Sequence, residues 1–274
     1  NTHISSLFMA INGVLEKNGY SLVCHIIEDG QTIDTDIIRD IAADNIGALI
    51  WSKSMEMNDM EKPDFLKNAM RNLSIPVITM EKYGFDCPGV DILFDYEKGG
   101  YMATRHLIEC GHRRIGCVAG KQSFHVTMQR LNGYKKALEE SGISYDPDLV
   151  YFGDYTMESG YEAFSYILGQ KVTAIFSMND EMAFGIYRAA RLYGVSIPED
   201  ISIIGFDNVP FADVMQVPLT TIGVPVIEMG KKLGEKVVDL IDNKEKLKER
   251  EEILYTPRLL VRGSTKSIPP VTVI

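Results

Sequence analysis

The feature that most constrains this chain is a nearly unbroken alternation of short apolar runs with amphipathic helical stretches. Two parallel strands are joined by a crossover that returns the chain to the same edge of the sheet, and a helix usually forms that crossover. In residues 6–18, for example, apolar side chains recur at i, i+3 and i+4, as in a helix that buries one face. The alternation therefore predicts an α/β fold in which parallel sheets are flanked by helices.

The expected elements follow one another with short connections. We expect strands at 20–27, 47–51, 75–80, 115–119, 149–152, 173–178 and 201–206, with an extended pair of segments in 253–261. We expect helices at 6–18, 35–44, 63–73, 98–110, 127–141, 158–168, 180–193 and 226–241. We expect the charge-rich segment 243–252 to form a surface turn exposed to solvent. This number of strand–helix units is more than a single hydrophobic core usually contains, so we predict two lobes.

Composition limits the partners and the compartment. The 274 residues carry a formal net charge of −10, whereas nucleic-acid binding usually needs a basic patch, so we do not expect the chain as given to contact DNA itself. No apolar run approaches the roughly 20 residues that span a bilayer. The four cysteines lack zinc-site or CxxC spacing, and we expect buried free thiols, which favours the cytoplasm.

Polar side chains follow two of the expected strands. Asn179 and Asp180 come directly after the strand at 173–178, and Asp207 comes directly after the strand at 201–206. In open α/β sheets, ligands bind outside the carboxyl ends of the strands. Amide and carboxylate groups at that edge suit a ligand rich in hydroxyl or amide groups, so we predict a small-molecule binding site there.

Seven short motifs occur in order along the chain: Gly99-Gly100 before His106, Gly111-His112-Arg113-Arg114-Ile115, Arg130-Leu131-Asn132-Gly133-Tyr134, Asn179-Asp180-Glu181-Met182-Ala183, Pro198-Glu199-Asp200-Ile201-Ser202, Gly205-Phe206-Asp207-Asn208 and Leu219-Thr220-Thr221-Ile222. Together they resemble the effector-binding core of the LacI/GalR transcriptional regulators, which shares the fold of periplasmic sugar-binding proteins. The resemblance covers nearly the whole chain. The Gly-His-x-x-Ile and Leu-Thr-Thr-Ile segments favour the regulator branch over the transporter branch.

The resemblance implies two lobes joined by short crossovers, residues 1–94 with 224–256 and residues 95–223 with 257–274. It implies a non-enzymatic sensor without a cofactor or metal, which closes on a sugar or sugar derivative and forms a homodimer. Operator DNA would be bound by a helix-turn-helix headpiece that is not part of this sequence. Because Asn1 matches the end of the family's first strand-to-helix loop, we also expect the first strand upstream of it.

The resemblance also implies the residues that bind the ligand, which are polar groups for ligand oxygens and an aromatic ring that stacks on the ligand: Arg130, Asn179, Asp207, Glu81, Tyr155 and His3. Arg130 would grip ligand oxygens through its planar fork. Glu81 stands where the family usually has Asp, and Thr2-His3, expected in the first loop, replaces the usual Pro-Phe. Both departures, with the apolar Val224-Pro225-Val226 segment, affect the first-lobe side of the pocket.

Several alternatives remain open at this point. Arg130 is alternatively a helix-surface residue paired with Glu139 or another acid, and Asp207 and Asn208 are alternatively turn residues. For Asp180, capping a helix ranks ahead of binding a ligand. Two other functions fit the pattern: a solute-binding protein of a sugar transporter, and a sugar-processing enzyme that uses Asp180 and Asp207 as an acid–base pair.

Overall fold

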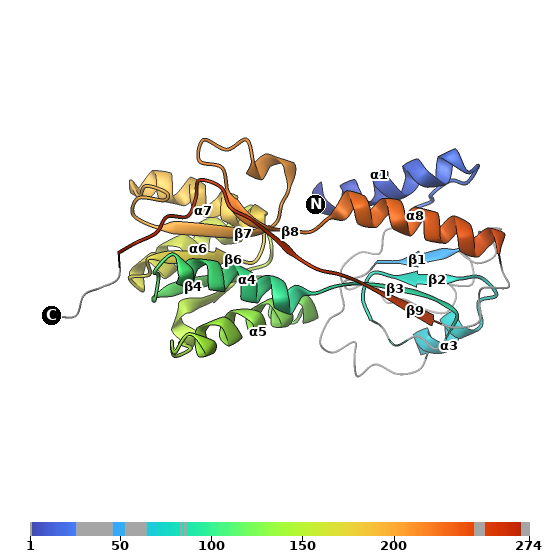
Figure 1. The fold of residues 1–274 in the computed structure, drawn as a ribbon, viewed down its shortest axis with the longest axis horizontal. Helices are drawn as coiled ribbons and strands as arrows, with labels where there is room; N and C mark the ends of the chain where they lie inside the picture. The colour runs from blue at the N-terminus through green and yellow to red at the C-terminus, as the bar shows by residue number, and fades with distance from the viewer. Residues whose placement is uncertain are drawn as a thin grey trace. The chain divides into compact units, whose positions relative to one another are not determined.

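The computed structural model describes residues 2–25, 46–52, 65–82, 84, 87–243 and 250–269. The chain forms two compact units (Figure 1). Unit 1 comprises Asn1–Phe94 and Pro225–Tyr255, and unit 2 comprises Asp95–Val224 and Thr256–Ile274. Each unit is built around its own sheet, and the chain passes from one unit to the other at residues 94, 224 and 255.

Unit 1 contains a parallel sheet in the order β1-β2-β3-β9. Its strands are β1 (Leu49–Trp51), β2 (Val77–Thr79), β3 (Gly89–Phe94) and β9 (Arg250–Tyr255). Its helices are α1 (Thr2–Lys17), α3 (Phe65–Arg71) and α8 (Val226–Asp242). Helices α1 and α8 lie side by side, and a Cβ atom added at Gly234 would come within 2.8 Å of the Val14 side chain, so glycine permits this close approach (Figure 1).

Unit 2 contains the larger sheet, in the order β10-β8-β7-β6-β4-β5. Its strands are β4 (Ile115–Ala119), β5 (Val150–Phe152), β6 (Ala174–Ser177), β7 (Ser202–Asp207), β8 (Thr220–Gly223) and β10 (Arg258–Leu260). All neighbours are parallel except β10, which pairs antiparallel with β8. The all-buried side chains of β4, β6 and β8 are typical of strands covered on both faces.

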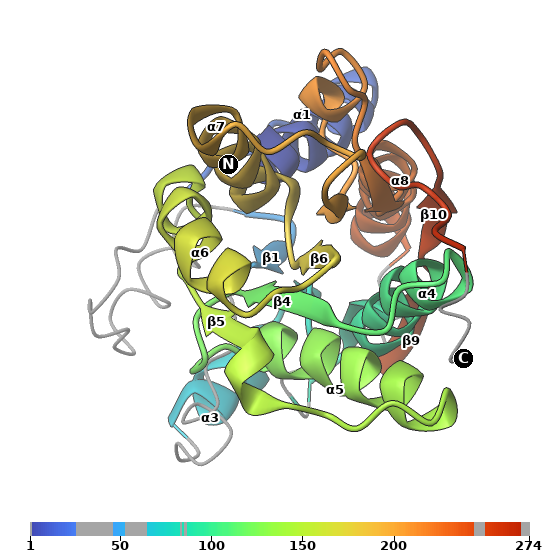
Figure 2. The ribbon, with the colours of Figure 1, turned by 90° about the vertical axis from the view of Figure 1, so that its left-hand side faces the viewer.

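Two pairs of helices cover the sheet of unit 2, one on each side of strands β4 and β6 (Figure 2). One pair is α4 (Tyr96–Glu109) with α5 (His125–Glu140), and the other is α6 (Met157–Gly169) with α7 (Asp180–Tyr193). Glycines bring the paired backbones together, since a Cβ atom added at Gly133 would lie 2.0 Å from the Glu97 carbonyl oxygen. This packing fixes α5, which carries Arg130, and the start of α7, where Asn179 and Asp180 lie.

The predicted fold class is confirmed, and most elements lie within a few residues of their predicted bounds. The structure differs from the predicted elements in the following places. Helix α1 begins at Thr2, so His3 lies in its first turn and not in a loop. Residues 20–25 form no strand, because no described segment pairs with them. Strand β9 begins inside the charged segment 243–252, and strands β3 and β8 were not predicted. The helix expected at 35–44 and the start of the one expected at 63–73 lie outside the described residues.

The cysteine prediction is correct for two positions only. Cys87 and Cys117 are buried free thiols, whereas Cys24 is exposed and Cys110 is partly exposed. Cys24 lies in the unpaired segment after α1, and Cys110 caps the end of α4, so neither enters a sheet. Among the described helices, none combines the length and the apolar character needed to cross a membrane.

Candidate functional site

Arg130 is the centre of a polar cluster at the carboxyl edge of the unit 2 sheet. It lies on the face of α5 that is buried against the sheet, and its side chain is only 7% exposed. One guanidinium nitrogen, Nη1, donates to the carbonyl of Met178 just beyond β6. The other, Nη2, lies 3.5 Å from Oδ1 of Asp207 at the end of β7. The alternative of a helix-surface arginine is therefore wrong, because the side chain is buried, and its acidic partner is Asp207, not Glu139.

Aromatic rings surround the same guanidinium group. Its Cζ atom lies 3.9 Å from the ring centre of Phe206, 4.9 Å from that of Tyr96 and 5.7 Å from that of Tyr155. Such contacts favour a cation over the ring faces. The third nitrogen, Nε, is buried and makes no hydrogen bond within the described part of the chain. Because an unpaired buried donor is costly, Nε is suited to donate to a ligand oxygen.

Asn179 caps helix α7. Its Oδ1 accepts a hydrogen bond from the Met182 amide at 2.9 Å, and its Nδ2 donates to the Tyr155 carbonyl at 2.9 Å. The capping role predicted for Asp180 therefore belongs to Asn179. The second bond joins the start of α7 to the loop that carries Tyr155.

Tyr155 adopts a left-handed backbone conformation with a φ of 72°, which is unusual for a bulky side chain. Its hydroxyl lies 2.7 Å from Oγ1 of Thr127, and its ring stacks on Phe124 with the ring centres 6.3 Å apart. A Cβ atom at Gly120 would lie within 2.1 Å of the ring, so the residue after β4 leaves room for the tyrosine. The surroundings thus hold Tyr155 in a strained position, as is common at functional sites.

Asp207 is the last residue of β7, and it and Asn208 both have positive φ values, of 107° and 57°. The segment 207–209 that leaves β7 is called the turn below, and within it Asp207 is the acidic partner of Arg130. Behind this turn lies Asp180, which is fully buried and accepts hydrogen bonds from the Thr221 hydroxyl and the Val209 amide. Burial, and secondarily the nearby carboxylate of Asp207, raise the pKa of Asp180 to about 8.

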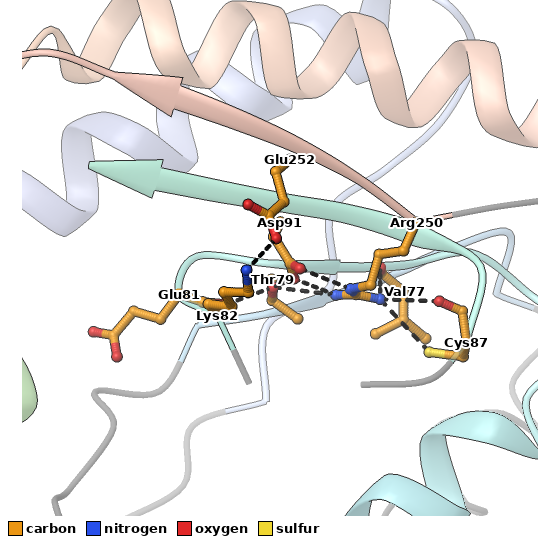
Figure 3. Close-up of polar contacts among 8 residues, drawn as sticks. All are labelled: Val77, Thr79, Glu81, Lys82, Cys87, Asp91, Arg250 and Glu252. Carbon is orange, nitrogen blue, oxygen red and sulfur yellow. Dashed lines mark hydrogen bonds and ion pairs between the residues drawn. The ribbon is translucent and has the colours of Figure 1, made fainter. Parts of the chain in front are cut away.

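Glu81 belongs to unit 1, in the segment that leaves β2. Its carbonyl oxygen accepts a hydrogen bond from the Thr79 hydroxyl at 2.7 Å, and its side chain points away from the polar network beside it (Figure 3). In that network, Arg250 of β9 binds the buried Asp91 of β3 through Nε at 2.9 Å and Nη2 at 2.5 Å (Figure 3). The Thr79 hydroxyl oxygen also lies against the same carboxylate. The network holds the end of β2, from which the segment that carries Glu81 continues. His3, in α1, has no described side chain.

We expect Arg250→Lys to destabilise unit 1 by about 1–2 kcal/mol. The planar fork of Arg250 also reaches the carbonyl of Cys87 at 3.2 Å, and a single ammonium group cannot replace all of these bonds. Urea denaturation measures the change. The matched control is Arg105→Lys, since Arg105 forms an exposed pair with Glu109, and this substitution should leave the free energy of unfolding nearly unchanged. Equal effects of the two substitutions would contradict a structural role for the network.

Four of the six predicted ligand-binding residues thus meet in unit 2: Arg130, Asn179, Asp207 and Tyr155. The other two, Glu81 and His3, belong to unit 1. The aromatic residues Tyr96, Phe124 and Phe206 were not predicted. Phe206 directly precedes Asp207 in the Gly-Phe-Asp-Asn motif, and this position was the sequence signal that could have placed it at the site.

Comparisons with known proteins point in one direction. A family model described as a periplasmic binding protein-like domain matches residues 104–265. The HTH-type transcriptional repressor PurR of Photobacterium profundum is 33% identical over 264 residues, which cover 94% of this chain and 77% of that protein. The HTH-type transcriptional regulator DegA of Bacillus subtilis is 36% identical over 248 residues, covering 90% and 72%.

The similar solved structures are also transcriptional regulators. A LacI family transcriptional regulator from Enterococcus faecium, crystallised with bound ribose, matches with a TM-score of 0.80 and 27% identity, covering 98% of this chain and 96% of that one. A complex of the transcriptional regulator CelR with cellobiose matches with a TM-score of 0.81 and 28% identity, covering 96% and 79%.

Proposed function

Because the chain belongs to the LacI family of transcriptional regulators, we propose that its ligand is a sugar or a sugar derivative, held in part by the Arg130 cluster of unit 2. The chain is the ligand-sensing core of such a regulator, and its relatives are regulators, not enzymes. The observation that carries the sugar proposal is the buried Arg130 guanidinium, which lies among three aromatic rings, faces the Asp207 carboxylate and has an Nε donor with no partner among the described residues.

The chemistry of the cluster fits a polyhydroxylated ring. The guanidinium fork donates to ligand oxygens, the Asp207 carboxylate accepts from hydroxyl groups, and the Tyr155 ring offers an apolar face to C–H groups. Two of the structural neighbours are described with bound ribose and bound cellobiose, which supports the same ligand class. In our proposal Glu81 and His3 complete the site from the other lobe.

We further propose that the lobes, residues 1–94 with 224–256 and 95–223 with 257–274, close on the ligand. A ligand shifts such an equilibrium only through its different affinity for the open and closed states. Operator DNA would be bound by a helix-turn-helix headpiece joined to this core, as the names of the relatives suggest. The formal net charge of −10 is in keeping with a core that leaves DNA contacts to another segment.

We propose a homodimer in the cytoplasm as the working form. Phe211 and Val214 of unit 2 are 61% and 71% exposed, and Phe211 packs edge-on against Phe184 of α7. Large apolar side chains exposed next to each other suit an interface between copies of the chain. A cytoplasmic location follows from the need of a bacterial-type regulator to reach its operator.

A thermal-unfolding screen tests the ligand class. The panel contains D-ribose, cellobiose, other pentoses and hexoses, phosphorylated sugars and nucleobases. We expect at least one sugar to raise the Tm with increasing concentration, since a ligand at a hundred times its Kd stabilises the native state by about 2.7 kcal/mol.

The sugar recovered after incubation should be chemically unchanged. A shift with nucleobases alone would show that the proposed ligand class is wrong. Turnover of a bound sugar would instead favour the enzyme alternative.

A further inference from the structure

A second carboxyl group lies directly behind the turn that carries Asp207. Asp180, the first residue of α7, is fully buried. Its Oδ1 accepts a hydrogen bond from the Thr221 hydroxyl of β8 at 2.6 Å, and its Oδ2 accepts one from the Val209 amide at 2.9 Å. One side chain therefore joins α7, β8 and the segment that follows β7.

The packing leaves this carboxyl group little freedom. A Cβ atom added at Gly205 would lie 2.2 Å from Oδ1 of Asp180, so the carboxyl group rests against the backbone of β7. Only glycine at 205 leaves space for it. The position of Asp180 is thus set by the strand that ends in Asp207.

The turn itself needs support. Asp207 and Asn208 both have positive φ values, of 107° and 57°, and non-glycine residues keep such conformations only where their surroundings impose them. Asp180 holds the turn from one side through the Val209 amide. Arg262 holds it from the other, donating to Oδ1 of Asn208 at 2.7 Å and to the Leu219 carbonyl at 2.7 Å.

We propose that Asp180 is a positioning residue for the ligand site, whose carboxyl group holds the turn that presents Asp207 to Arg130. The proposal rests on the proposed function, because it assigns Asp180 a part in the same site without contact to the ligand. It differs from the capping role and from the acid–base role predicted from the sequence. Asn179 fills the first of these, and the regulators related to this chain leave the second without support.

The bridge depends on shape more than on charge. With its pKa raised to about 8, Asp180 is largely protonated at neutral pH. A protonated carboxyl group still accepts from the Val209 amide and can donate to Oγ1 of Thr221. Asparagine provides the same acceptor and donor in the same volume, whereas alanine provides neither, and the two substitutions therefore separate positioning from charge.

The experiment compares Asp180→Asn and Asp180→Ala in the whole chain, first without ligand. The amide resonances of residues 207–209 report the turn directly. We expect them to stay near their wild-type positions in the asparagine variant and to shift in the alanine variant. Asp200→Ala is the matched control, since the Asp200 carboxylate also accepts a backbone N–H, from Ser196 at 2.7 Å, outside this turn.

Binding is then measured with D-ribose and with each sugar that raised the Tm. We expect the asparagine variant to bind within about threefold of wild type, and the alanine variant to bind at least roughly tenfold more weakly, as for one lost hydrogen bond to the turn. If the alanine variant fails to fold, Thr221→Val decides, because it removes one of the two bonds and should weaken binding several-fold.

Unshifted resonances of 207–209 in the alanine variant (or in Thr221→Val, where that variant decides) would overturn the inference, as would unchanged sugar affinity in that variant. A shifted turn in a protein that binds none of the sugars would instead count against the proposed sugar ligand, and would leave Asp180 as the residue that holds the turn.

Discussion

Replacing Arg130 by alanine should lower the affinity for the sugar at least about a hundredfold, because hydrogen bonds to a charged group contribute roughly 1.5–3 kcal/mol each. The substitution removes the Nε donor, and it leaves the Asp207 carboxylate and the Met178 carbonyl without their cationic partner. Arg130→Lys keeps the charge but not the planar fork, so we expect a loss of roughly tenfold. Calorimetric titration with each sugar that raised the Tm measures both affinities.

Arg188→Ala is a closely matched control for this prediction. Arg188 also pairs with a carboxylate, Glu158 at 3.3 Å, and also lies over an aromatic ring, 4.8 Å from the centre of Tyr161, but its side chain is 53% exposed. Its loss should leave sugar binding unchanged. Wild-type affinity in a folded Arg130→Ala variant would show that Arg130 does not bind the ligand. If that variant does not fold, Arg130→Lys answers the question instead.

Local periodicity was sufficient to predict most of the described helices and the strands that form an unbroken apolar run. The strand at 115–119 and the helix at 180–193 have the predicted bounds, because the first is a short apolar run and the second is an amphipathic stretch that ends at Gly194. Strand β3 escaped prediction because Asp91 interrupts its apolar run, and the start of β9 escaped because Arg250 lies in a charged segment. These two residues neutralise each other, but 159 positions separate them in the sequence. No local pattern could have paired them.

The candidate site also combines residues that the sequence could predict with roles that only the structure shows. The resemblance to a family indicated Arg130 and Asp207, and the structure places them beside each other. The resemblance could not assign separate roles to Asn179 and Asp180. Both are small hydrogen-bond acceptors at the start of a helix, and only the structure shows that Asn179 caps it. Phe206 was interpreted as strand core, which it is, and only its contact with the guanidinium group shows its second role.

The stability of the wild-type chain should fall relative to Asp180→Asn as the pH rises from 5 to 8, by about 4 kcal/mol, at roughly 1.4 kcal/mol per pH unit. The sign follows from the pKa of Asp180, which is about 8 in the folded chain against an ordinary value of 3.8. Between these values the folded state binds a proton that the unfolded state lacks. The stabilisation is therefore present in full below pH 4 and is lost as the pH approaches 8.

Comparison with the asparagine variant isolates this group from others that titrate in the same range. Burial lowers the pKa values of His106 and His112, which makes the folded state more stable as the pH rises, but this contribution is common to both proteins and cancels. The groups that act on Asp180 are Asp207, which raises its pKa, and Arg262, which lowers it together with the bonds from Thr221 and Val209. Urea denaturation at half-unit pH intervals gives the difference. A difference that does not change with pH would mean that Asp180 is ionised throughout, and that the bonds from Thr221 and Val209 and the positive charge of Arg262 outweigh its burial.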